Sequence, residues 1–155
     1  MRIKIPGYGE LVLSHLVMDY NGTLAIDGRL IEGVREALIK LSESLSLHVL
    51  TADTFGIAKE GLEGIPCRLT ILPKDDQQGG KLGFVQNLGA GQVAAIGNGR
   101  NDQLMLKEAA LGIAVILEEG TSVQTLQSAD VVCRSIVSAL ELLLNPLRLT
   151  ATLRS

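Results

Sequence analysis

Two short apolar segments, far apart in the chain, each run into a glycine turn that carries carboxylate and amide side chains. The first is Leu16-Val17-Met18-Asp19-Tyr20-Asn21-Gly22-Thr23-Leu24, and the second is Ala94-Ala95-Ile96-Gly97-Asn98-Gly99-Arg100-Asn101-Asp102. Each apolar run is short, β-rich and stopped by a turn signal, so it is predicted to be a buried strand. Asp19 would then lie at the carboxyl tip of its strand, where open α/β sheets bind ligands. Together, the two strand tips predict one site for a metal ion and a phosphate group.

Two further residues have the chemistry of a phosphate site. Thr51 ends the next predicted strand, in Val49-Leu50-Thr51-Ala52-Asp53, and offers a hydroxyl and a backbone N–H to phosphate oxygens. Lys81 would place a compact positive charge against a phosphoryl group. A carboxylate such as Asp19 can attack phosphorus or bind Mg²⁺, a hard cation that prefers oxygen ligands. Gly22 lets the backbone approach a ligand closely.

Each of these features has an ordinary structural explanation when it is taken singly. Asn21-Gly22 is a common hairpin turn. A threonine at a strand end is usually a cap, and a lone lysine such as Lys81 is usually a solvated charge. The segment Gly97–Asp102 could be a loop that ends in a helix cap. The order and spacing of all four features are less easily explained in this way.

The elements that would position these residues alternate between strand and helix, after a hairpin formed by Arg2–Ile5 and Glu10–Leu13. The predicted strands are Leu16–Met18, Leu47–Leu50, Cys67–Leu72, Val93–Ile96, Gly112–Ile116 and Val131–Cys133. The predicted helices are Gly33–Leu45, Phe55–Leu62, Lys81–Leu88, Asp102–Ala110, Ser122–Gln127 and Ile136–Leu144. Pro73–Gly80 is expected to be a loop, and the residues after Asn145-Pro146 a tail. Repeated βα units predict one domain over residues 1–155, with a parallel sheet, helices on both faces and the βα loops at one edge.

Composition excludes several classes of function. The chain has 155 residues, a formal net charge of −3 and only 3% aromatic residues, which argues against nucleic-acid binding. No apolar stretch approaches the roughly 18–20 residues of a membrane span, and the N-terminus is too short and polar for a signal peptide, so we expect a cytoplasmic protein. Cys67 and Cys133 form no CxxC motif and are expected to be buried thiols. His15 and His48 are expected to be structural.

The combined pattern resembles the haloacid dehalogenase (HAD) superfamily of aspartate-based phosphohydrolases. Within it, the chain is similar to the small soluble proteins akin to the phosphorylation domain of P-type ATPases. The resemblance covers about Leu16 to Leu144 and implies a HAD-like Rossmannoid three-layer sandwich. The matching segments are Asp19–Thr23 for the first motif, Thr51 for the second, Lys81 for the third, and Gly97–Asp102 with Met105-Leu106 and Ala109–Val115 for the fourth and its extension.

The resemblance implies a Mg²⁺-dependent phosphatase that acts on a phosphorylated substrate through an aspartyl phosphate. Asp19 would be the nucleophile, and Asp102 would support the metal or orient Lys81. The implied catalytic residues are Asp19, Asn21, Thr51 and Lys81. The implied phosphate ligands are Asp19, Gly22, Thr51, Ala52 and Lys81. The implied metal ligands are Asp19, the backbone carbonyl of Asn21, Asn98 and Asp102.

Two positions depart from the pattern of the family, because most of its phosphatases carry aspartate where this chain has Asn21 and Asn98. Asn21 cannot protonate a leaving group or activate water, and losing a general acid–base costs typically ~10²–10⁴ in rate. Asn98 can offer an oxygen to Mg²⁺ but no charge. P-type ATPases also lack an acid at the first position and still form an aspartyl phosphate. We therefore expect a slow phosphatase; the alternative is a catalytically weak or inactive relative that binds phosphate or a partner.

The segments in which family members insert a substrate-selecting cap domain are short in this chain. Little separates Thr23 from the predicted helix at Gly33, and one helix and one strand fill the stretch from Thr51 to Lys81. We therefore expect no cap domain and an open site. The exposed edge of the N-terminal hairpin predicts pairing between copies, and hence a homo-oligomer.

Overall fold

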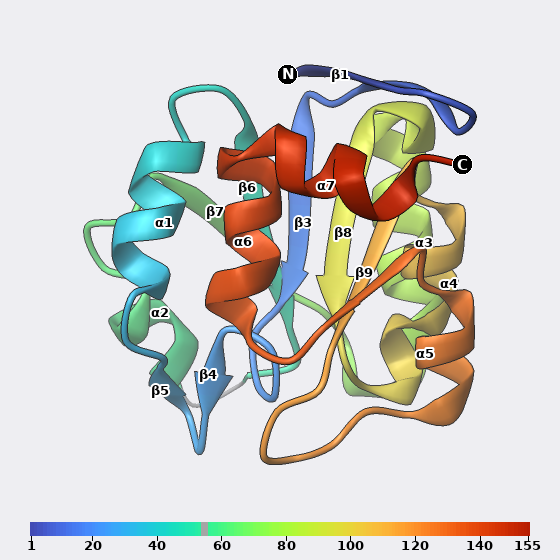
Figure 1. The fold of residues 1–155 in the computed structure, drawn as a ribbon. Helices are drawn as coiled ribbons and strands as arrows, with labels where there is room; N and C mark the ends of the chain where they lie inside the picture. Colours follow the sequence, from blue (N-terminus) through green and yellow to red (C-terminus); the bar gives the residue numbers. More distant parts are fainter. Residues whose placement is uncertain (54–55) are drawn as a thin grey trace.

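The computed structural model describes residues 1–53 and 56–155, and its centre is a six-stranded parallel sheet in the order β10-β9-β8-β3-β6-β7. The strands are β3 (His15–Asp19), β6 (Ser46–Thr51), β7 (Cys67–Ile71), β8 (Val93–Gly97), β9 (Leu111–Val115) and β10 (Val131–Cys133). Helices cover both faces of this sheet (Figure 1). The structure confirms the predicted α/β fold with a parallel central sheet.

Two helical layers enclose the sheet. One face carries α1 (Val34–Leu41), α6 (Ile136–Leu144) and α7 (Pro146–Leu153), and the other carries α3 (Gln77–Leu88), α4 (Gln103–Glu108) and α5 (Val123–Ser128) (Figure 1). The remaining helical pieces are α2 (Ile57–Gly61), η1 (Lys74–Asp76), η2 (Ala90–Gln92) and η3 (Arg100–Asp102). No single helix among the described residues is long and apolar enough to cross a membrane; α6 and α7 pass that test only together, and they are bent by 101°.

The position of the strand β3 at the centre of the sheet explains why its sequence is apolar. Leu16 and Met18 lie in the core cluster that includes residues of α1 and α6, whereas Val17 lies in the cluster that includes residues of α3 and α4. Successive side chains of a strand point to opposite faces of the sheet. Because both faces are covered by helices, every position of the strand must be apolar until the chain reaches Asp19 at its tip.

The predicted N-terminal hairpin is present as β1 (Arg2–Ile5) and β2 (Gly9–Val12), which pair antiparallel. It lies at the amino ends of the central strands, at the end of the molecule opposite to their carboxyl tips (Figure 1). The end of the chain packs against it, where the Ser155 N–H donates to the Pro6 carbonyl at 3.2 Å. The hairpin is therefore remote from the tips of β3, β6 and β8.

Two expectations about segments outside the central sheet are wrong. The chain between β3 and α1 forms an unpredicted small hairpin, β4 (Ala25–Ile26) and β5 (Arg29–Leu30), whose turn uses the left-handed residues Asp27 and Gly28. The expected C-terminal tail is the helix α7, which has Pro146 in its first turn, where the missing N–H costs nothing. The predicted helix Phe55–Leu62 corresponds to α2, and Phe55 itself lies outside the described residues.

The expectation that Lys81 opens its helix is also wrong. The predicted loop Pro73–Gly80 is partly helical, since α3 begins at Gln77, and Lys81 therefore lies in its second turn. Asp76 caps this helix, because its side chain accepts a hydrogen bond from the Gly79 N–H at 2.9 Å. The two glycines at 79 and 80 favour a loop by propensity, but the cap and the burial of Lys81 and Val85 outweigh that preference.

Candidate active site

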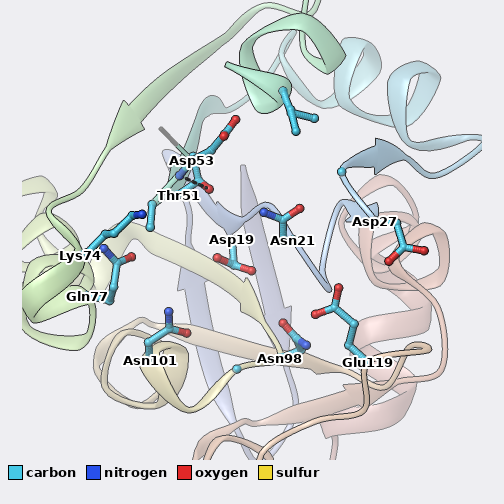
Figure 2. Close-up of a pocket in the computed structure, with 14 residues that line it drawn as sticks. Asp19, Asn21, Asp27, Thr51, Asp53, Lys74, Gln77, Asn98, Asn101 and Glu119 are labelled. Carbon is cyan, nitrogen blue, oxygen red and sulfur yellow. Dashed lines mark hydrogen bonds between the residues drawn. The ribbon is translucent and has the colours of Figure 1, made fainter. Parts of the chain in front are cut away.

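Three strand tips meet at one edge of the sheet. Asp19 is the last residue of β3, Thr51 is the last residue of β6, and Asn98 directly follows β8. The strand β3 pairs with β6 on one side and β8 on the other, and all three strands run parallel. Their carboxyl ends therefore lie together, around a cavity of about 620 Å³ (Figure 2).

The lining of this cavity contains predicted and unpredicted residues. Five of the predicted site residues line it, namely Asp19, Asn21, Thr51, Ala52 and Asn98. Asn101, from the predicted segment Gly97–Asp102, also lines it, and the polar lining residues that were not predicted are Asp27, Asp53, Lys74, Gln77 and Glu119. Most of these lie in segments that follow strands, and the general rule that βα loops share one edge was the signal that pointed to them.

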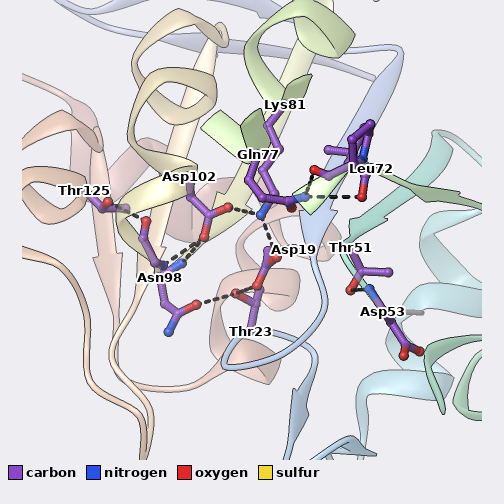
Figure 3. A network of polar contacts seen from close by, with 12 residues as sticks. Asp19, Thr23, Thr51, Asp53, Leu72, Gln77, Lys81, Asn98, Asp102 and Thr125 are labelled. Carbon is purple, nitrogen blue, oxygen red and sulfur yellow. Dashed lines mark hydrogen bonds and ion pairs between the residues drawn. The ribbon is translucent and has the colours of Figure 1, made fainter. Parts of the chain in front are cut away.

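Lys81 is placed behind Asp19, in the interior, and is not among the residues that line the cavity. Its Nζ lies 2.6 Å from Asp19 Oδ1 and 2.6 Å from Asp102 Oδ1, so that the lysine bridges the two carboxylates (Figure 3). The Lys81 side chain is fully buried. An ammonium group has three N–H donors, and these two ion pairs use two of them.

The bridge places one positive and two negative charges inside the protein. Burial and the charge of Asp102 raise the pKa of the Asp19 carboxyl to about 7, although Lys81 acts in the opposite direction. Burial alone would lower the pKa of Lys81, but the two carboxylates outweigh it and raise that pKa. The group therefore carries an excess of negative charge when Asp19 is ionised, which a bound cation would relieve.

Both carboxylate oxygens of Asp102 bind groups of the protein itself. While Oδ1 is paired with Lys81, Oδ2 accepts hydrogen bonds from the backbone N–H groups of Asn98 and Gly99, each at 2.9 Å. Asp102 is fully buried and does not line the cavity. From the interior of the protein, Asp102 therefore orients both Lys81 and the turn after β8.

The hydroxyl of Thr23 lies between the two tips of the site. Thr23 Oγ1 is 3.2 Å from Asn98 Oδ1 and 3.4 Å from Asp19 Oδ2, and its side chain is fully buried (Figure 3). In the sequence, Thr23 stands out only as part of the segment Asp19–Thr23, since a small hydroxyl after a turn carries no specific signal. Its contact brings oxygen atoms of Asp19 and Asn98 to the same side of the cavity.

Gly22 leaves a gap beside these oxygens. Its φ is +76°, and a Cβ atom added there would lie 2.5 Å from Asn98 Nδ2 and 2.7 Å from Glu119 Oε2. The turn between Asn21 and Thr23 therefore requires glycine both for its backbone conformation and for the close approach of these side chains.

Thr51 and Asn98 lie on opposite sides of Asp19 in the cavity (Figure 2). Its side chain is buried, and its hydroxyl accepts a hydrogen bond from the Asp53 N–H at 3.2 Å. Asp53 in turn accepts from the Ala58 N–H at 2.6 Å, which ties this tip to α2. The hydroxyl proton of Thr51 is not used by that bond, since the oxygen is the acceptor there.

The donor atoms at this edge suit a hard divalent cation. Asp19 brings a carboxylate and Asn98 a carbonyl oxygen, on either side of the Thr23 hydroxyl, and the missing Cβ of Gly22 leaves space beside them. Oxygen ligands of this kind fit Mg²⁺. No group of three or more His, Cys, Asp or Glu side chains suited to a metal occurs among the described residues. A cation here would therefore depend on few charged ligands.

Sequence comparison links the chain to archaeal proteins. The uncharacterized protein MJ0073 of Methanocaldococcus jannaschii is 54% identical over 63 residues, which are 41% of this chain and 68% of that protein. The chain belongs to the family of MJ0073. A second member, the uncharacterized protein MJ0072 of the same organism, is 46% identical over 39 residues, or 25% of this chain and 89% of that protein. No family model matches the chain.

Solved structures show how the fold of the MJ0073 family relates to that of known enzymes. The 3-deoxy-D-manno-octulosonate 8-phosphate phosphatase of Moraxella catarrhalis, in complex with magnesium, phosphate and KDO, matches with a TM-score of 0.66 at 21% identity, over 85% of this chain and 86% of that one. The cobalt-bound enzyme of Haemophilus influenzae gives 0.66 at 16% identity (89% and 88% covered), and the Yersinia pestis enzyme gives 0.67 at 15% (99% and 95% covered). These structural neighbours are HAD-family phosphatases, and the chain has their fold.

Proposed function

We propose that the chain is a HAD-type phosphohydrolase of the small soluble, P-type-ATPase-like kind, which depends on Mg²⁺ and works slowly through a phosphorylated Asp19. The single observation that carries the proposal is the arrangement of Asp19. Its Oδ1 is held by buried Lys81, and the carboxylate opens into a cavity at the carboxyl edge of the sheet. The solved phosphatase structure with this fold that holds magnesium and phosphate supports the same assignment.

The first half-reaction needs mainly position and charge. Asp19 Oδ2, the oxygen not paired with Lys81, is the atom proposed to attack phosphorus, so that an Oδ–P bond forms while the bond from phosphorus to the leaving group breaks. Lys81 holds the carboxylate in place and keeps a positive charge behind it. A cation bound by Asp19, Asn98 and the Asn21 carbonyl would neutralise charge on the phosphoryl oxygens. The Thr51 hydroxyl and the backbone at Ala52 are proposed to bind those oxygens.

In the second half-reaction water hydrolyses the aspartyl phosphate, and for this step the chain lacks a general base at position 21. Asn21 lines the cavity near Asp19 (Figure 2), but its amide cannot take a proton from water. Good leaving groups such as aryl or acyl phosphates need little protonation, so these substrates should phosphorylate Asp19 readily. Turnover is then limited by the loss of phosphate from Asp19.

The test is a comparison of steady-state rates on an aryl phosphate with Mg²⁺ present. We expect Asn21→Asp to raise the rate by at least about tenfold, because it restores a group that typically contributes ~10²–10⁴. Asp19→Asn should abolish turnover. Circular dichroism of each variant controls for folding.

A second candidate function is that of a non-catalytic relative that binds phosphate or a partner. The specific observation in its favour is that both Asn21 and Asn98 present amides to the cavity. If Asp19→Asn matches the parent rate and Asn21→Asp gains nothing, Asp19 is not a working nucleophile and this second function takes its place.

A further inference from the structure

The loop after β9 presents two adjacent glutamates to two different cavities. The Gly120 N–H donates to the Leu117 carbonyl at 2.9 Å, and Gly120 has a φ of +74°, so residues 117–120 form a tight turn with Glu118 and Glu119 at its centre. Glu119 lines the cavity that contains Asp19, Asn21 and Asn98. Glu118 instead lines a separate cavity together with Arg134.

This turn is fastened directly to Asn98. The Asn98 side-chain Nδ2 donates to the Gly120 carbonyl at 3.1 Å, and the Ser122 N–H donates to the Asn98 carbonyl at 2.9 Å. Asn98 is itself buried at the tip of β8. Glu119 is exposed, but the backbone directly after it is held against the site by these two hydrogen bonds to Asn98.

The glutamate side chain reaches the gap left by Gly22. A Cβ added at Gly22 would lie 2.7 Å from Glu119 Oε2 and 2.5 Å from Asn98 Nδ2, so both of these atoms lie directly beside Gly22. Figure 2 shows the Glu119 carboxylate between the side chains of Asn21 and Asn98. The two other unpredicted carboxylates of the cavity are less suited to bind a cation beside Asn98. Asp53 accepts a hydrogen bond from the Ala58 N–H, and Asp27 lies at the margin of the cavity, farther from Asp19 than Glu119 does (Figure 2).

We propose that Glu119 supplies the second negative charge to the divalent cation of this site, in place of the charge that Asn98 lacks. The inference rests on the proposed function, since it concerns the same cation. An amide at position 98 is the residue that fits this arrangement, because its Nδ2 must donate to Gly120 beside the Glu119 carboxylate. With Glu119 present, a carboxylate at position 98 would face a like charge next to Gly22.

The test is a titration of the metal-free protein with Mn²⁺, with free Mn²⁺ followed by electron paramagnetic resonance and Mg²⁺ used as a competitor. Glu119→Gln should weaken binding by about tenfold or more, a loss of the size that ligand-sphere changes usually cause. Glu118→Gln is the matched control, since it removes the same charge one residue away, and it should leave the affinity unchanged. Asp19→Asn should weaken binding strongly.

A charge swap separates the role of Glu119 as a ligand from a role in shaping the loop. In the double variant Asn98→Asp/Glu119→Gln the carboxylate moves to position 98, and the affinity lost in Glu119→Gln should return. If Glu119→Gln equals Glu118→Gln while Asp19→Asn weakens binding, the inference about Glu119 is overturned and the metal site stands. Failure of the swap to recover affinity also overturns it. If Asp19→Asn does not weaken binding, the metal site of the proposed function fails with it.

Discussion

At the scale of single residues, the site is an unbalanced group of buried charges. Asp19 and Asp102 share one lysine; the Lys81 and Asp102 side chains are fully buried, and the Asp19 side chain is only 12% exposed, toward the cavity. Taking charges out of water is costly, and pairing repays this cost only when the charges balance. The excess negative charge is a local cost to stability that makes Asp19 ready to bind a cation and a phosphoryl group.

The stability of the metal-free protein should depend on the ionisation of Asp19. The pKa of this carboxyl in the folded protein, about 7, is above the ordinary value of 3.8, so the protonated carboxyl favours folding at low pH. This contribution is fully present below the ordinary pKa and is lost as the pH rises through the folded value. The Asp19→Asn variant carries a neutral amide, which mimics the protonated carboxyl at every pH.

We therefore expect Asp19→Asn to be more stable than the parent at about pH 8 when no metal is bound. The parent should lose stability between about pH 5 and pH 8 as Asp19 ionises, and the variant should lack this contribution. The measurement is urea unfolding of both proteins with a chelator present. A variant that is less stable than the parent at both pH values, with an unchanged pH dependence, would contradict the charge argument.

At the scale of elements, the ends of the central strands could be predicted from the sequence, whereas the start of α3 could not. Alternating strand and helix patterns put Asp19, Thr51 and Asn98 at one edge, because parallel strands joined by crossovers leave their βα loops together. The start of α3 was missed because Gly79 and Gly80 hide a helix whose first turn depends on the Asp76 cap. Glu119 was missed because its position depends on hydrogen bonds between Asn98 and a distant turn, which no local pattern encodes.

The Asp76 cap should affect both stability and the position of Lys81. Asp76→Ala removes the acceptor for the Gly79 N–H and is expected to cost about 1 kcal/mol of the free energy of unfolding. Asp75→Ala is the matched control, because Asp75 is the exposed neighbour in η1 and should change stability by less than ~0.5 kcal/mol. Chemical unfolding of the two variants measures the difference, and equal stabilities would show that the cap does not hold α3.

At the scale of the whole molecule, different features lie at the two ends of the central sheet. The carboxyl ends carry the cavity, while the amino ends carry the hairpin β1–β2 and the end of the chain (Figure 1). In the described residues, the segment between β3 and α1 holds only the small hairpin β4–β5. Association through the N-terminal hairpin would therefore leave the cavity open to a substrate.

Assembly through that hairpin remains a prediction. Val12 lies on β2 and is partly exposed, and a lysine in an edge strand discourages pairing. We expect light scattering to give a mass above that of one chain for the parent and a lower mass for Val12→Lys. Val123→Lys, on α5, is the control and should keep the parent mass. A parent that is monomeric at high concentration would contradict the prediction.

The most direct test of the central claim is to trap the phosphoryl group on Asp19. The parent is mixed with an acyl or aryl phosphate and Mg²⁺, quenched with acid, and examined by intact mass and peptide mapping. We predict one added phosphoryl group on the peptide that contains Asp19, its faster loss in Asn21→Asp, and its absence in Asp19→Asn. A parent that takes up no phosphoryl group, or a label that persists in Asp19→Asn, would contradict the account.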